Sequence, residues 1–109
     1  MPIANCIVTT DCQHNSFDLV ELWAKESGQS SEHMTINITT STHQYGNKYT
    51  IMATLWLPSI WSKSNISSLQ LGLAKALAYY FNIAPSEIHV ITQIVESGNV
   101  VEGGKEIQW

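Results

Sequence analysis

The sequence predicts an α+β fold, in which two strand–helix–strand units form a four-stranded mixed sheet with both helices on one face. Strand and helix patterns alternate in that order twice along the 109 residues. A shift of 54 residues also places Met34 and Ile36 on Ile88 and Val90, so the second strands of the two units correspond. We therefore expect one domain over residues 1–109, with related halves at about 1–40 and 49–95. Each half suits a right-handed crossover between parallel strands.

The first half opens with a strand over Pro2–Thr10, where branched apolar residues stand among small ones. A helix follows, with Asn15 or Ser16 as its N-cap and Asp18 in its first turn, where a carboxylate complements the helix dipole. Gly28 is expected to end this helix as its C′ residue. Apolar residues at helical spacing supply the buried face, namely Phe17, Leu19, Val20, Leu22 and Trp23.

Two strands are expected in the middle of the chain. Met34, Ile36 and Ile38 alternate with polar residues, a pattern that is typical of a half-buried strand. The segment Tyr49–Leu57 is rich in β-branched and aromatic residues and is closed by Pro58, so it predicts the third strand.

The second half continues with a longer helix, which we expect to begin at an Asn65 cap and to run to about Phe81. Pro85 then turns the chain into a fourth strand, Ile88–Val95. Three glycines within residues 96–109 indicate a short hairpin or a bulge in the tail. The apolar face of the helix consists of Ile66, Leu69, Leu73, Ala76, Leu77 and Tyr80.

The composition favours an oligomer and excludes several classes of protein. Only 13% of the residues are charged and 44% are hydrophobic, and the sheet would leave one face uncovered, so we expect other subunits to cover it. The net charge is −4, and all five cations are scattered lysines, which gives no basic stripe for nucleic acid. No apolar run approaches the roughly 20 residues of a membrane span, and no signal segment is visible, so we expect a soluble cytoplasmic protein.

No metal site or cofactor is expected. His14, His33, His43 and His89 lack the spacing of paired metal ligands, and no glycine-rich phosphate pattern occurs. Cys6 lies within the first strand and is expected in the core.

Pro2 is the residue with the most distinctive chemistry. A small residue after Met1 favours removal of the initiator methionine, which would leave Pro2 as the first residue, with a secondary amine at the start of a strand. Such an amine accepts a proton, whereas an internal proline nitrogen is an amide. Partial burial among Ile3, Ile91, Trp56 or Trp109 would lower the pKa of this amine toward neutrality, as a general base requires.

Three segments resemble the tautomerase superfamily, whose members begin with a catalytic proline. They are the start Met1-Pro2-Ile3, the first helix end Ser27-Gly28-Gln29-Ser30-Ser31, and Leu77–Val95, which reads LAYYFNIAPSEIHVITQIV. In length and layout the chain is similar to the macrophage migration inhibitory factor and 5-carboxymethyl-2-hydroxymuconate isomerase groups, and it also resembles the 4-oxalocrotonate tautomerase type. The resemblance implies a tautomerase-like homotrimer and a cofactor-independent tautomerase, an isomerase that moves a proton within a keto or enol substrate.

The resemblance also implies substrate-binding positions around the catalytic Pro2. Gln29 falls where the inhibitory-factor group has a lysine, His89 where it has a tyrosine, and Ile91 where it has an asparagine. Trp109 would supply the aromatic wall that the family takes from its C-terminal region. His89 or Lys63 is the candidate to stabilise the developing enolate oxygen.

The absence of arginine argues against the dicarboxylates that relatives of the oxalocrotonate type hold with arginine, and favours a neutral or monocarboxylate keto–enol substrate such as an arylpyruvate. Two alternatives remain open. If Met1 is retained, Pro2 is an amide, and the protein is an inactive tautomerase-fold trimer that acts as a binding or structural module. An unrelated ferredoxin-like small-molecule binder would share the same order of strands and helices.

Overall fold

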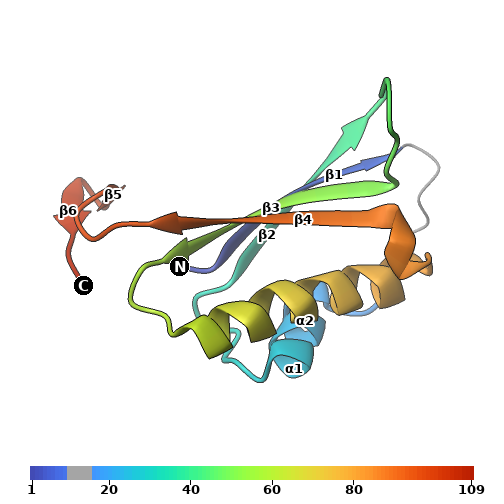
Figure 1. Cartoon of the computed structure of the whole chain (residues 1–109). Coiled ribbons are helices and arrows are strands. Elements are labelled where there is room, and N and C mark those ends of the chain that lie inside the picture. The colour runs from blue at the N-terminus through green and yellow to red at the C-terminus, as the bar shows by residue number, and fades with distance from the viewer. Residues whose placement is uncertain (10–15) are drawn as a thin grey trace.

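The computed structural model of the protein describes residues 1–9 and 16–109. The strands and helices follow in the predicted order, with a short 3-10 helix and a C-terminal hairpin added (Figure 1). They are β1 (Ile3–Thr9), α1 (Leu19–Ser27), β2 (Thr35–Ser41), β3 (Ile51–Pro58), α2 (Lys63–Phe81), the 3-10 helix Pro85–Glu87, β4 (Ile88–Val95), β5 (Val100–Glu102) and β6 (Lys105–Ile107).

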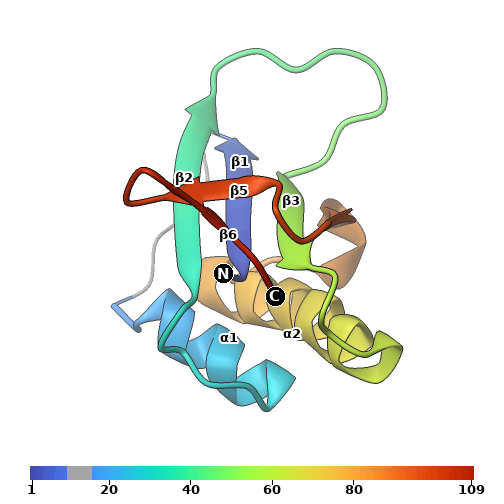
Figure 2. The same cartoon turned by 90° about the vertical axis from the view of Figure 1, so that its left-hand side faces the viewer.

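The main sheet has the strand order β2-β1-β3-β4 and is mixed, as predicted. β1 and β2 are parallel, β3 and β4 are parallel, and the two central strands β1 and β3 are antiparallel. One row of the sheet runs through Thr35, Ile3, Trp56 and Gln93. The strands of the C-terminal hairpin pair only with each other and lie beyond the end of the main sheet (Figures 1 and 2).

Both helices cover the same face of the sheet, which confirms the predicted layers (Figure 1). Alternate residues of the two central strands point into this layer and are buried. These residues are Ala4, Cys6 and Val8 from β1 and Ile51, Ala53, Leu55 and Leu57 from β3. Cys6 is buried in the core, as expected, and this burial raises the pKa of its thiol to about 12.

The two helices contact each other closely. The indole Nε1 of Trp23 in α1 donates a hydrogen bond of 3.0 Å to the carbonyl of Leu69 in α2. Gly72 of α2 lies against Ser27, and a Cβ at position 72 would be 2.8 Å from the Ser27 nitrogen. Only glycine therefore allows this approach of the two backbones.

The ends of the elements correct three predictions. Asp18 is the N-cap of α1, since its Oδ1 accepts hydrogen bonds from the backbone nitrogens of Val20 and Glu21. The predicted cap at Ser16 is therefore wrong, and the alternative, Asn15, lies outside the described residues. The C-terminal end at Gly28 is confirmed, with a left-handed backbone at φ 70°.

α2 begins at Lys63, earlier than predicted. The cap is Ser62, whose hydroxyl accepts a hydrogen bond of 3.2 Å from the backbone nitrogen of Asn65, so Asn65 lies inside the first turn. β3 begins at Ile51, not at Tyr49, because both backbone groups of Tyr49 bond to the side chain of Gln44. No helix in the described part of the chain is long and apolar enough to cross a membrane.

Candidate functional site

Pro2 lies at the start of the central strand β1 and is buried. Its carbonyl accepts a hydrogen bond of 3.0 Å from the backbone nitrogen of Thr35, so the chain start is fixed to β2. Because side chains alternate along a strand, Pro2 shares the helix-covered side with Ala4. The sheet therefore holds Pro2 in a fixed position that is largely shielded from solvent.

A cavity of about 280 Å³ adjoins the chain start, and we call it the N-terminal cavity. The segment between α1 and β2 forms one wall, and Glu102 from the C-terminal hairpin forms another. Pro2 itself does not line this cavity, but its neighbours Met1 and Ile3 do, and its carbonyl accepts a hydrogen bond from the lining residue Thr35. The lining residues are Met1, Ile3, Glu32, His33, Met34, Thr35 and Glu102.

The position of the N-terminal amine changes its acid–base behaviour. Burial lowers the pKa of the Met1 amine below its ordinary value of 8.0, and the negative charge of Glu102 partly offsets this by raising it. A lowered pKa increases the unprotonated fraction at neutral pH, and the unprotonated amine is the form that accepts a proton.

His89 and Ile91 lie together on the opposite, uncovered face of the sheet. They line a cavity of about 540 Å³ over the middle of the four strands. The His89 ring packs against Tyr49, with ring centroids 4.9 Å apart. The amide of Asn37 donates to Oδ1 of Asn5 at 3.0 Å on this same face, so the face is more polar than the sequence suggested.

Pro2 and His89 do not meet within one chain. His89 pairs with Met52, which pairs with Ile7, five residues along β1 from Pro2. At roughly 3.3 Å per residue, this corresponds to about 16 Å along the strands. A site that uses both residues must therefore take them from different copies of the chain.

Gln29 and Lys63 lie at the edge of the helix layer, and neither lines the N-terminal cavity. Gln29 follows the Gly28 cap, and its Nε2 donates to Oδ1 of Asn65 at 3.3 Å. This bond joins the end of α1 to the first turn of α2. Lys63 is the first residue of α2 and is exposed, so it belongs to a helix and not to the expected connection.

Trp109 anchors the end of the chain. Its indole Nε1 donates to the hydroxyl of Ser59 at 2.9 Å, and its backbone nitrogen donates to the hydroxyl of Ser97 at 2.8 Å. Ser59 follows β3 directly, so the half-buried Trp109 lies at the end of the sheet that carries Pro2, and both termini lie at this end of the molecule (Figure 1).

The comparisons with known proteins rest on the fold. No protein-family model matches the chain, and no curated protein is similar to it in sequence. Native fused 4-OT superposes with a TM-score of 0.76 over 96% of this chain and 95% of that chain, at 10% identity. The chain has the tautomerase fold.

Two other solved structures with the tautomerase fold are similar. The macrophage migration inhibitory factor from Trichinella spiralis superposes with a TM-score of 0.73 at 13% identity, over 97% of this chain and the whole of that chain. N1, a member of the cis-3-chloroacrylic acid dehalogenase family, has a TM-score of 0.71 at 10% identity, over 97% of this chain and 83% of that chain. The predicted fold class is thus confirmed. Sequence identities this low establish a shared fold and not a shared activity.

The charged side chains that line the N-terminal cavity were not predicted from the sequence. Glu32 and His33 are adjacent in a polar segment without a recognisable motif, and Glu102 lies far from them in the sequence, in the C-terminal hairpin. The position of that hairpin beside Met1 depends on tertiary structure, which the pattern of residue types does not specify.

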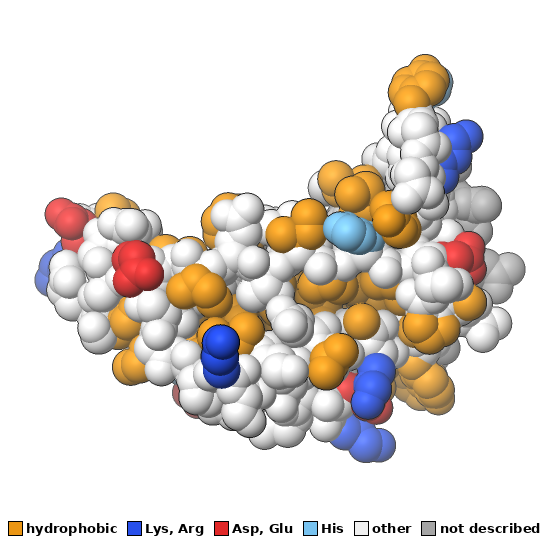
Figure 3. All heavy atoms as spheres, in the orientation of Figure 1, with side chains coloured by type: hydrophobic (Ala, Val, Ile, Leu, Met, Phe, Trp, Pro, Cys, Tyr) orange, Lys and Arg blue, Asp and Glu red, His pale blue; other side chains and the backbone are white. Residues whose placement is uncertain are grey.

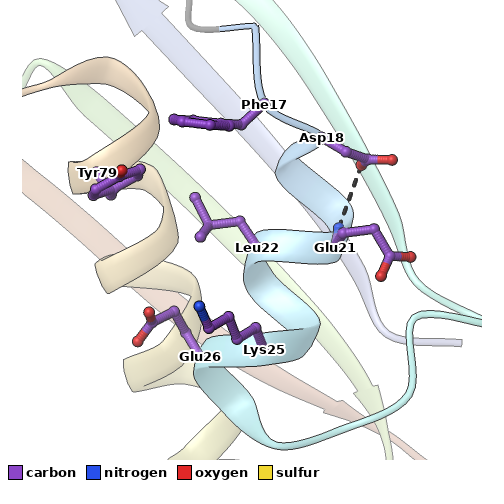
Figure 4. Close-up of a pocket in the computed structure, with 7 residues that line it drawn as sticks. All are labelled: Phe17, Asp18, Glu21, Leu22, Lys25, Glu26 and Tyr79. Carbon is purple, nitrogen blue, oxygen red and sulfur yellow. Dashed lines mark hydrogen bonds between the residues drawn. The ribbon is translucent and has the colours of Figure 1, made fainter.

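A third cavity, of about 420 Å³, lies between the two helices and contains none of the predicted site residues. Phe17 and Tyr79 form its aromatic side, with ring centroids 5.6 Å apart, and Leu22 lies beside them (Figure 4). The face in Figure 3 shows charged side chains as scattered groups, without a continuous basic stripe. Among the described residues, no group of three potential metal ligands is found.

Proposed function

We propose that this protein is a cofactor-independent isomerase that moves a proton within a keto or enol substrate, with the N-terminal amine of Pro2 as the base. The observation that carries the proposal is the place of Pro2 in a tautomerase fold. It is buried immediately before the central strand β1, its neighbours Met1 and Ile3 line a cavity, and it is the first residue once Met1 is removed.

The proposed step needs only one basic nitrogen. The unprotonated amine takes a proton from the carbon next to the substrate carbonyl, and the electron pair of that C–H bond forms the C=C bond of an enolate. The oxygen then receives a proton from the amine or from water, which gives the enol. In the reverse direction, the same amine removes the enol proton and returns a proton to carbon.

Burial supports this role. A free proline amine is mostly protonated at neutral pH, and a protonated amine cannot act as a base. The burial that lowers the pKa of the Met1 amine acts on the same end of β1, where Pro2 itself is buried. An apolar surrounding would therefore lower the pKa of the Pro2 amine in the mature chain as well.

We further propose that the active form is a homotrimer. Two similar structures, R7 and Q0 of fused 4-OT, are described as an asymmetric and a symmetric trimer, with TM-scores of 0.77 and 0.76. Ile7 and Ile91 are each 47% exposed on the uncovered face of the sheet, a surface that association would bury. Association would also let His89 and Ile91 of one protomer approach Pro2 of the next.

Intact mass and a matched pair of proline variants test the proposal. We expect the native chain to lack Met1 and to accelerate the exchange of phenylpyruvate between enol and keto forms, followed by ultraviolet absorbance. Pro2→Ala should lower the rate by about 100-fold or more, the usual contribution of a general base. Pro85→Ala changes an exposed proline in the 3-10 helix and should leave the rate unchanged.

The alternative of an inactive binding module is favoured by one observation. Gln29 replaces the family's lysine, and its side chain is bonded to Asn65 instead of to the N-terminal cavity. Retention of Met1 in the native protein, or equal rates for wild type and Pro2→Ala, would establish this alternative. Light scattering of the purified protein separately tests the trimer.

A further inference from the structure

The charges around the chain start are almost all of one sign. Glu32 and Glu102 both line the N-terminal cavity, one from the segment between α1 and β2 and the other from the C-terminal hairpin. His33 is the third titratable side chain there, and the cavity lining contains no lysine. The chain has no arginine to compensate.

The lysines lie elsewhere in the structure. Lys25 lines the cavity between the helices, and Lys63 and Lys75 belong to α2. Lys48 lies in the segment before β3, and Lys105 pairs in register with Glu102 on the hairpin without lining the cavity. Among the described residues of a single protomer, the N-terminal amine is therefore the one basic nitrogen besides His33 that adjoins this space.

We propose that Glu32 and Glu102 form an acidic wall that makes the site select neutral keto or enol substrates over anionic keto acids. This rests on the proposed function, because it names the substrate class of the same Pro2 site. The wall acts by disfavouring the wrong ligand, a common source of specificity.

The charge that a substrate meets in the site depends on the protonation state of the amine. A protonated amine would attract a carboxylate, but the general base must be unprotonated and therefore neutral. In that state the two glutamates are the formal charges that a substrate meets in the cavity. A substrate carboxylate would lose water on entry and face like charges, with no guanidinium to receive it.

The selectivity for neutral substrates is tested by comparing phenylpyruvate with its methyl ester. The two compounds share the same keto group and aromatic ring and differ by one negative charge. We expect a higher kcat/KM for the ester in the wild type. Glu102→Gln and Glu32→Gln should each raise the kcat/KM of the anion relative to the ester by about threefold, a size typical of charges at exposed positions. Glu106→Gln, on the same hairpin but outside the cavity, should leave the ratio unchanged.

The acidic wall can also be tested without enzymatic turnover, by measuring how fast charged and neutral reagents alkylate the chain-start amine. Bromopyruvate and bromoacetone alkylate amines and differ in charge, and peptide mass mapping measures their rates at the chain start. If neither substrate is turned over but Glu102→Gln and Glu32→Gln raise the relative rate of bromopyruvate, the isomerase is wrong and the acidic wall stands. If turnover occurs and both variants leave the anion-to-neutral ratio unchanged, the isomerase stands and the wall is overturned. If there is no turnover and the alkylation ratio is also unchanged, both are overturned.

Discussion

Pro2 and Ile51 occupy equivalent places in the two halves of the molecule. Ala4 pairs with Ile36 in the first half, and Ala53 pairs with Val90 in the second. Pro2 and Ile51 precede these alanines by two residues, and both are buried. The same position thus holds an ordinary core side chain in one half and the chain start in the other.

The difference lies in what precedes each residue. Ile51 follows Thr50, whose backbone nitrogen donates to the carbonyl of Glu87 at 2.9 Å, so the strand continues into the preceding segment. Pro2 follows Met1, which lines a cavity. Under the proposed function, one strand–helix–strand unit supplies packing at the point of the fold where its counterpart supplies the basic amine.

The largest expected effect tests this division of roles. Ile51→Ala removes a side chain with 0% exposure and should lower the free energy of unfolding by about 2–5 kcal/mol, because a cavity remains in the core. Pro2→Ala should cost less stability and should abolish most of the activity. Urea denaturation of both variants provides the measurement. An equal loss of stability in the two would show that Pro2 is a packing residue like Ile51.

The contact between the halves gives the second prediction. At position 72 a methyl group would lie 2.8 Å from a backbone atom of Ser27, so Gly72→Ala should destabilise the protein by about 1–3 kcal/mol. Helix propensity alone predicts the opposite sign, a gain of about 1 kcal/mol. Lys75→Ala, on the exposed side of the same helix, should be nearly neutral. A more stable Gly72→Ala would mean that α1 and α2 are not in close contact in solution.

Much of this fold could be predicted because its periodicities are strong. The bounds of β4 coincide with the prediction, Ile88–Val95, since Pro85 and the apolar run leave little choice. The starts of both helices were wrong for a local reason. Several residues that can cap lie close together, and the chosen one is decided by which side chain reaches the free backbone nitrogens.

The site was less predictable than the fold. Pro2 could be singled out from its place after Met1, but its burial depends on the strands around it. Glu102 reaches the chain start through the hairpin, and His89 is separated from Pro2 by the register of three strands. Both relations are long-range, and residue spacing in a single sequence does not specify them.

The helix caps allow a smaller test of how the halves differ. Asp18→Ala and Ser62→Ala should each cost about 1 kcal/mol, because each removes the acceptor for free backbone nitrogens at a helix start. The loss should be larger at Asp18, which accepts two hydrogen bonds and carries a negative charge at the positive end of the dipole. Thermal denaturation measures both. Ser16→Ala is the control and should be silent, and a loss there would restore the sequence-based cap.

The smallest expected effect concerns the amine itself. Because burial lowers the pKa of the Met1 amine, we expect the pKa of the chain-start amine to be lower in the native protein than in the urea-unfolded protein, as measured by the pH dependence of alkylation. By linkage, the stability that this group contributes is present above the unfolded pKa and is lost as pH falls through the folded pKa. The Glu102 carboxylate raises the pKa of the Met1 amine, and we expect the same charge to act on the Pro2 amine of the mature chain. Glu102→Gln should therefore lower that pKa and shift the acid limb of the rate profile to lower pH. An unchanged limb would place Glu102 too far from the amine to act on it, whereas a shift would show that the second half's tail tunes the reactive end of the first.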